Sequence, residues 1–310
     1  MSGNWKSVRP SQLCRSFLRA GSQNTQRAYA IDLRQFREFV GVKTDVEAVR
    51  RFCDMSAGAA ARTLRDFQGW LRGRGYSANT VRRRISSMLS LAAMAKQYDV
   101  IQWSVRIQLP RASLTRDTRG PTRQQIEEMI EVCEDRGDAK GARDKAIVEL
   151  LFFCALRSSE LLSIDLEHYD RPHCLVSVRA KARWDRETVF IPLRVRDSID
   201  EWLEHRGEDD GPMFVSFNAS ARASRQRLTY RGLYDLVSRL GREVGIRCRP
   251  HGLRHAGITE ALRLLNGDIL QVMSFSRHRD PRTILAYVDA LEDRGRSVAE
   301  IVADGRPFRG

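Results

Sequence analysis

The chain has 310 residues, enough for two domains of ordinary size, and 42% of them are apolar, which fits a globular protein with a sizeable core. Lysine and arginine together number 53 against 39 acidic residues, so the net charge is +14. Of these 53 residues, 47 are arginines, whose planar donors fit phosphate oxygens. A general bias toward arginine explains part of the preference over lysine but not the net charge. A polyanionic partner, above all nucleic acid, is therefore expected.

The chain carries no sign of a membrane segment or of a disulfide framework. The longest apolar stretch, residues 146–156, is interrupted by Glu149, and the N-terminus lacks the apolar stretch of a secretory signal. The basic N-terminus also fits a mitochondrial transit peptide, but residues 22–40 already predict a domain helix. The six cysteines are scattered without a CxxC pair, which favours a reducing compartment. We expect a cytoplasmic protein that contacts no membrane.

The first third of the chain, residues 1–105, holds 11 of the excess positive charges and predicts a domain built from helices. Thr25 is the expected cap of a helix that reaches Val40, with apolar residues three and four positions apart. Other helices are predicted over 10–19, over 45–54, from 56 to 73 and from 77 onward.

Three consecutive arginines, Arg82, Arg83 and Arg84, lie at the start of the last of these helices. Val81 and Ile85 are expected to face the core, so at least two of the arginines must point outward. They form either a solvated face or a contact with a DNA backbone, and the surrounding positive charge favours the contact.

Residues 106–121 contain two prolines, several arginines and no helical period, and they predict an extended linker. A second domain, 122–310, begins at Thr122 and Gln125, which form a capping-box pattern. Strands are predicted over 173–179 and 187–192, with helices over 142–156, 194–205, 228–244, 250–265, 267–275, 281–290 and a C-terminal helix over 297–303. The expected fold is mainly α with a small β-hairpin or sheet, an α+β class.

Several common chemistries have no support in the sequence. There is neither a P-loop nor a GxGxxG pattern, and the carboxylates do not cluster as a two-metal site requires. His251 and His255 have the i, i+4 spacing of zinc ligands, but Gly252 stands where a glutamate should follow, and no third ligand is evident. We therefore expect neither a metal nor a cofactor.

Residue types that bind phosphate do recur at the ends of predicted elements. Arg157 follows the most apolar helix, Lys181 lies in the predicted β-turn, Arg254 follows His251 at the start of a helix, and His278 precedes another. Tyr287 lies nine residues after His278 on the next helix. Taken singly, each has an ordinary structural explanation, as a cap, a core residue or a surface residue. Their joint occurrence in this order favours a shared site.

This constellation resembles the tyrosine recombinase (phage integrase) family, in particular its two-domain, Xer-like members. The family pattern is a G-L-R-x-S-E-L-L segment, a lysine in a β-hairpin, H-x-L-R-H, a G-H pair and a tyrosine nine residues later. Here the segments are A-L-R-S-S-E-L-L, Lys181, H-G-L-R-H, R-H and Tyr287. Family glycines are replaced by Ala155, by Ala180 and Ala182 beside the lysine, and by Arg277, which is the change expected to shift the local backbone.

The resemblance implies a catalytic role for each residue. Arg157 and Arg254 would hold the phosphate oxygens, and Tyr287 would be the nucleophile. His251 would be the base, Lys181 the general acid and His278 a hydrogen-bond partner of the phosphate. Glu160 is expected to brace the site without touching the phosphate, and His255 is either a supporting residue of this kind or a purely structural histidine. Arg183 is expected to contact DNA beside Lys181, although a solvated turn explains Arg183 equally well.

The resemblance also implies a partner and an assembly. Residues 1–105 would be the core-binding, DNA-contacting domain and 122–310 the catalytic domain. The partner would be double-stranded DNA, with a monomer free in solution and four protomers on two DNA sites. The expected activity is site-specific recombination through a 3′-phosphotyrosine. The alternatives are a type IB topoisomerase-like enzyme that relaxes DNA, and a catalytically inactive DNA-binding protein.

Overall fold

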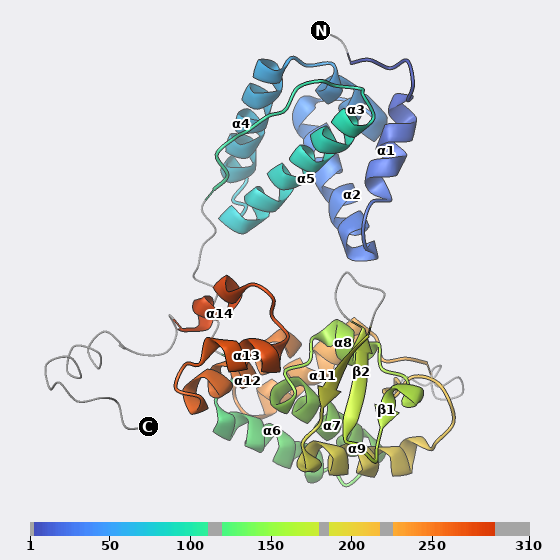
Figure 1. The fold of residues 1–310 in the computed structure, drawn as a ribbon, viewed down its shortest axis with the longest axis vertical. Coiled ribbons are helices and arrows are strands. Elements are labelled where there is room, and N and C mark those ends of the chain that lie inside the picture. Colours follow the sequence, from blue (N-terminus) through green and yellow to red (C-terminus); the bar gives the residue numbers. More distant parts are fainter. Residues whose placement is uncertain (1–2, 111–119, 180–185, 218–225, 289–310) are drawn as a thin grey trace, which may run out of the picture. The chain divides into compact units, whose positions relative to one another are not determined.

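The computed structural model describes residues 3–110, 120–179, 186–217 and 226–288 (Figure 1). The chain divides into two compact units, residues 1–114 and 115–310. Helices dominate both, and a small three-stranded sheet lies in the second, so the expected mainly α class with a small sheet is confirmed. Within the described ranges, no helix has the length and apolar character needed to cross a membrane.

The first unit contains five helices in its described part: α1 (Pro10–Leu18), α2 (Gln23–Val40), α3 (Asp45–Cys53), α4 (Ala57–Gly73) and α5 (Ala78–Gln97). Their positions confirm the helices predicted from the apolar spacing. The cap of α2 is Ser22 rather than Thr25, because the Ser22 hydroxyl accepts the Thr25 backbone N–H and the helix begins earlier. Thr44, Ser56 and Ser77 cap the three helices that follow.

Aromatic side chains form the centre of this unit. The Phe36 ring meets the edges of Phe52 and Phe67 at centroid distances of 5.4 and 5.3 Å. The chain beyond α5 still belongs to this core, since Ile107 and Leu109 pack against it. These two residues fall in the segment predicted as linker. Their apolar side chains, two positions apart, pack this extended segment against the helices. The segment itself has no helical periodicity.

The second unit contains α6 (Arg123–Glu134), α7 (Ala139–Phe153), α8 (Ser158–Leu162), α9 (Leu193–Arg206), α11 (Tyr230–Glu243), α12 (Pro250–Leu264), α13 (Ile269–Ser276) and α14 (Pro281–Val288). The predicted capping box of α6 is confirmed, with Thr122 and Gln125 each binding the other's backbone N–H. The C-terminal helix expected over 297–303 lies outside the described residues.

The sheet has the order β1–β2–β3 and is antiparallel throughout, with β1 at Tyr169–Asp170, β2 at Leu175–Arg179 and β3 at Arg186–Phe190. Arg179 and Arg186 are the last paired residues of the β2–β3 hairpin. Residues 180–185, predicted as a turn and containing Lys181 and Arg183, lie outside the described residues. The two-residue β1 was not predicted, because so short a strand leaves no alternating pattern.

Helix α7 is buried on nearly all sides and runs through the middle of the second unit (Figure 1). Its two buried carboxylates are paired with arginines. Asp144 accepts from Arg239 at 2.8 Å, and Glu149 from Arg194 at 2.8 Å. Helix α12 crosses the end of α7 closely, since a Cβ at Gly257 would lie 2.2 Å from the Phe152 carbonyl oxygen. This crossing brings α12 to the turn that follows α7.

Candidate active site

The turn after α7 is the base of the site. The prediction extended this helix to residue 156, but it ends at Phe153 because Ala155 adopts a left-handed conformation, with φ of +44°. The Leu156 N–H donates across the turn to the Leu150 carbonyl. Glycine is the residue that adopts this conformation most readily, which explains why glycine was expected at position 155. The turn places Arg157 immediately before the short helix α8.

Glu160 is the buried acidic centre of the site, with 1% of its surface exposed. Its carboxylate accepts the Arg157 backbone N–H at 2.8 Å and also binds the Arg157 guanidinium. Arg277 donates to it at 2.9 Å, and an Arg254 nitrogen lies 4.0 Å away. Burial alone would raise the pKa of Glu160, but the Arg277 charge and the bonds from Arg157 outweigh burial and lower it. Glu160 therefore stays ionised and joins three guanidinium groups.

Arg254 lies on α12 and is 1% exposed. Its guanidinium donates to the Ala155 carbonyl and, at 2.6 Å, to the Ser276 carbonyl, so it bridges the ends of α7 and α13. Burial, together with the neighbouring charges of Arg157 and Arg277, lowers the pKa of Arg254 to about 9. The group is still a cation at neutral pH, and carbonyls at helix C-termini are favourable partners for a cation.

His278 faces Arg254 from the segment after α13. The Ser276 hydroxyl donates to the Val272 carbonyl at 2.6 Å, so its oxygen accepts from His278 Nδ1, which lies 2.8 Å away. That arrangement puts the proton on Nδ1 and leaves Nε2 as an acceptor, 3.4 Å from an Arg254 nitrogen. Burial and the surrounding arginines lower the pKa of His278 to about 4, so the ring is neutral at pH 7.

Tyr287, on α14, is 3% exposed and belongs to a small apolar cluster that includes Ala155. Its ring centroid lies 4.8 Å from that of His255 and 6.5 Å from that of His278. His255 in turn meets the exposed His251 edge-on at 4.1 Å. One chain thus places His251, His255, His278 and Tyr287 next to the arginine cluster.

The structure therefore gathers seven of the residues singled out in the second domain: Arg157, Glu160, His251, Arg254, His255, His278 and Tyr287. Arg277 was noted in the sequence only as a replacement for glycine. Its guanidinium enters the site and binds Glu160, a contact between distant parts of the chain for which the local sequence gives no signal.

In the first unit, the three consecutive arginines differ in exposure. Arg82 and Arg83 are exposed, and Arg83 binds the buried Asp32 at 2.5 Å. Arg84 is buried, with its guanidinium stacked 3.8 Å from the centroid of the Tyr76 ring and bonded to Gln35 at 3.2 Å. The charged end of Arg84 is thus held inside the unit, which does not favour a DNA contact by this residue, and its contact with DNA stays a prediction.

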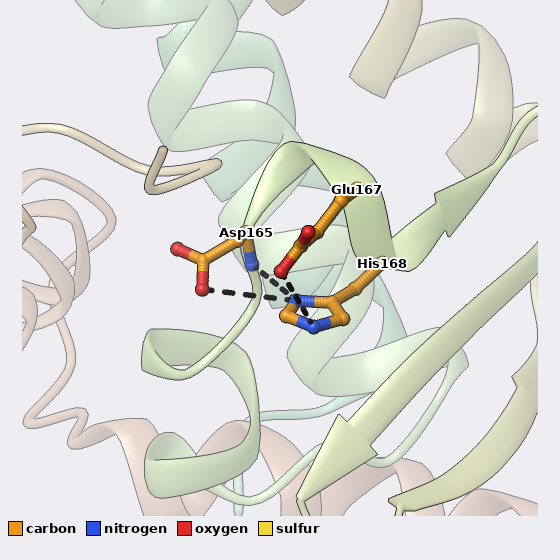
Figure 2. A group of neighbouring side chains, drawn as sticks. All are labelled: Asp165, Glu167 and His168. Atoms are coloured by element: carbon orange, nitrogen blue, oxygen red, sulfur yellow. Dashed lines mark hydrogen bonds and ion pairs between the residues drawn. The ribbon is translucent and has the colours of Figure 1, made fainter. Parts of the chain in front are cut away.

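A group of potential metal ligands lies apart from this site, at Asp165, Glu167 and His168 (Figure 2). His168 Nδ1 accepts the Asp165 backbone N–H at 3.0 Å, and its Nε2 lies 3.3 Å from Glu167. Asp165 also binds the Arg227 guanidinium. These side chains are therefore bonded within the protein, and their arrangement is that of a helix cap rather than of an ion cage.

Comparison with known proteins agrees with this geometry. The model of the phage integrase family matches residues 121–294, more than half of the chain, and that of the phage integrase N-terminal SAM-like domain matches residues 16–98. A tyrosine recombinase of Synechococcus elongatus is 31% identical over 281 residues, covering 88% of this chain and 86% of the relative. The tyrosine recombinase XerC of Mycobacterium leprae is 30% identical, covering 91% and 93%.

Solved structures show the same fold. The Tn1549 transposon integrase in complex with transposon right end DNA superposes with a TM-score of 0.70 at 15% identity, over 96% of this chain and 100% of that one. The XerH recombinase bound to its difH substrate, in a post-cleavage complex, gives 0.67 at 18% identity, over 95% and 85%. Fold and sequence together define a site-specific recombinase of the tyrosine class. The chain belongs to the phage integrase family.

Proposed function

We propose that the Tyr287 hydroxyl attacks a DNA phosphodiester, forming a 3′-phosphotyrosine and releasing a 5′-hydroxyl. A 5′-hydroxyl of a second duplex then attacks the phosphotyrosine, which restores the phosphodiester and frees the tyrosine. The number of phosphate ester bonds is conserved in each step. The observation that carries the proposal is the convergence of Tyr287, Arg157 and Arg254 around one turn, at Ala155.

The arginines supply the electrostatic part of this chemistry. The attacked phosphate gains negative charge in the transition state, and preorganised cations stabilise it most where water is excluded. Arg157, whose side chain is 24% exposed, would meet the phosphate first. Arg254 would follow by exchanging a carbonyl partner for a phosphate oxygen. Losing one such contact typically lowers the rate by about 10²–10³.

Proton transfer is assigned to groups on both sides of the phosphate. A phenol with its usual pKa of about 10 is largely protonated at neutral pH, so Tyr287 needs a base. The exposed His251 is our candidate, with His255 packed between it and the tyrosine as the residue that orients the ring. Lys181, which lies between β2 and β3 in the sequence, would protonate the leaving 5′-oxygen. A bound phosphate would raise the pKa of His278, which could then donate to it.

The substrate proposed is double-stranded DNA, which residues of both units would contact. The first unit carries most of the net positive charge, with Arg82 and Arg83 exposed on α5. Arg183 would add a contact beside Lys181. The XerH and Tn1549 proteins were solved with DNA, which supports this partner. The six cysteines, all free and buried, support a reducing cytoplasm as the compartment.

We propose that the protein is a monomer in solution and a homotetramer on two DNA sites. An apolar groove of about 560 Å³ between α7, α12 and α13 supports this assembly, because Phe153, Leu264 and Phe275 line it. The amphipathic C-terminal segment 297–303 of a neighbouring protomer is the proposed occupant. Light scattering on the protein with and without DNA tests it: Leu264→Arg should block the tetramer and leave the monomer intact.

The proposed reaction is tested with a nicked suicide duplex, which traps the covalent adduct. The wild-type protein should form a protein–DNA band that resists denaturant, and Tyr287→Phe should form none while binding the same duplex. An adduct formed by Tyr287→Phe would refute the nucleophile. The reaction should proceed equally in EDTA, and activity that EDTA removes and Mg²⁺ restores would contradict the metal-free mechanism. Relaxation of supercoiled plasmid without strand exchange would favour the topoisomerase-like alternative.

A further inference from the structure

Arg277 occupies a backbone position that favours glycine. It ends α13 in a left-handed conformation, with φ of +56° and ψ of +39°. Residues with a Cβ adopt this conformation at an energetic cost, and isolated exceptions cluster at functional sites. The sequence has arginine at this position, so the contacts of the arginine side chain must offset the cost of this backbone conformation.

The Arg277 side chain is inserted between two helix ends, with 10% of its surface exposed. Its guanidinium donates to the carbonyls of Cys154 and Ala155, at 3.2 and 2.8 Å, beyond the end of α7. It also donates to the Phe275 carbonyl of α13 at 3.1 Å. One planar group thereby joins the turn before Arg157 to the helix end before His278.

The same guanidinium completes the charge balance around Glu160. It donates to the carboxylate at 2.9 Å, while the Arg277 backbone carbonyl accepts from Arg157 at 3.1 Å. The charged groups that face Glu160 are Arg157 from the N-cap of α8, Arg254 from α12 and Arg277 from the C-cap of α13, with His278 beside them. The Arg277 charge is the largest single cause that lowers the pKa of Glu160 against its burial, and the hydrogen bonds and charge of Arg157 act in the same direction.

We propose that Arg277 is a positioning residue of the strand-transfer site: it fixes the Ala155–Arg157 turn and pairs with the buried Glu160, so that Arg157 is held ready for the scissile phosphate. Arg277 does this without touching DNA, since both terminal nitrogens of its guanidinium donate to protein acceptors and its Nε is buried. The proposal rests on the proposed function of the site. It assigns to a residue expected to be glycine a role in setting both the reaction rate and its pH dependence.

The test is the rate of adduct formation on the suicide duplex, measured from pH 5 to pH 9 together with DNA affinity and melting temperature. Arg277→Gly suits the left-handed backbone and removes the whole side chain, including the guanidinium. We expect it to react about 10- to 100-fold more slowly, because the turn that carries Arg157 loses its anchor. DNA affinity should change by less than about threefold, and the acidic limb of the pH profile should move up by about one pH unit as Glu160 loses a neighbouring cation.

Two further variants separate charge from shape. Arg277→Lys keeps the charge and should recover part of the rate and the wild-type acidic limb. Adding Arg277→Gly to Glu160→Gln should cost much less than it does in the wild type, because coupled residues are not additive. Arg171→Gln is the matched control. It removes an exposed arginine that pairs with Asp200 and is distant from Arg277 in the sequence, so the rate of adduct formation and its pH profile should stay unchanged.

The outcomes distinguish this inference from the proposed function. If the wild type forms no adduct, the proposed function itself fails. If the wild type reacts and Arg277→Gly reacts at the same rate with the same pH profile, only the role of Arg277 is refuted, and the arginine is merely tolerated. The role of Arg277 would also be refuted if Arg277→Lys reacted as slowly as Arg277→Gly with the same shift of the pH profile. Fully additive effects of Arg277→Gly and Glu160→Gln on the rate would refute it as well.

Discussion

The Arg157 backbone N–H donates to the Glu160 carboxylate at 2.8 Å, and the Arg157 side chain binds the same carboxylate. One buried acid thus fixes both ends of the arginine that is proposed to meet the phosphate. The arrangement works only while the acid is charged, because a neutral carboxyl would leave a cluster of guanidinium groups without a counter-charge.

Replacing this acid should therefore damage both stability and activity. Glu160→Gln keeps the shape but leaves the buried arginines without an anion, and we expect a loss of about 3–5 kcal/mol in the free energy of unfolding. Urea denaturation at pH 7 measures it. Glu201→Gln, which removes an exposed acid from α9, is the control and should cost less than about 1 kcal/mol. A Glu160→Gln protein as stable as the wild type would show that the acid is not the counter-charge.

His278 should make stability depend on pH. Burial, aided by the nearby arginines, lowers its pKa to about 4 in the folded protein, from the usual 6.5. The unfolded chain therefore binds a proton near pH 6.5 that the folded chain takes up only near pH 4. As pH falls through this window, the folded state should lose up to about 3 kcal/mol.

The measurement is urea denaturation of His278→Gln and wild type at pH 7.5, 6 and 5. The variant should lose less stability on acidification. His168, whose pKa is also lowered, remains in both proteins and cancels in the comparison. His205→Gln, at an exposed position on α9, should follow the wild-type curve. Parallel curves for His278→Gln and wild type would contradict a neutral, buried His278.

The close crossing of α12 and α7 should not tolerate a methyl group. A Cβ at position 257 would lie 2.2 Å from the Phe152 carbonyl oxygen, so Gly257→Ala must push α12 away and displace Arg254. We expect a loss of about 1–3 kcal/mol in stability, with slower adduct formation. Gly252→Ala on the same helix has only ordinary contacts, at 3.8 Å and beyond, and should be neutral or stabilising. Equal effects of the two substitutions would exclude the close crossing.

The sequence predicted the helices well because their apolar spacing and caps are local signals, as at Thr122 and Gln125. The sequence analysis extended α7 to residue 156 because Ala155 and Leu156 continue the apolar pattern. No local sequence signal indicates that Ala155 adopts a left-handed conformation. That conformation is set by the contacts which the turn makes with Arg254 and Arg277, residues about a hundred positions away in the chain.

The same reasoning applies to the site. The site could be recognised from the sequence because the family pattern consists of residue types at fixed spacings. Those residues are Arg157, Arg254, His278 and Tyr287. The burial of Arg84 and the insertion of Arg277 were not predictable, because charge alone suggests exposure. Each is held by partners on other segments, Tyr76 for Arg84 and Glu160 for Arg277.

The three arginines of α5 should respond differently to mutation. In full-length protein carrying Tyr287→Phe, Arg82→Ala should weaken DNA binding at every sequence and lower the slope of log affinity against log salt by about one. Arg84→Ala should leave that slope unchanged and lower the melting temperature instead, because it empties the space between Tyr76 and Asp32. Fluorescence anisotropy from 50 to 300 mM salt and thermal denaturation provide the two readouts. If Arg84→Ala lowered the salt slope with an unchanged melting temperature, the guanidinium would have to reach the phosphates, and its burial in the helical unit would be wrong.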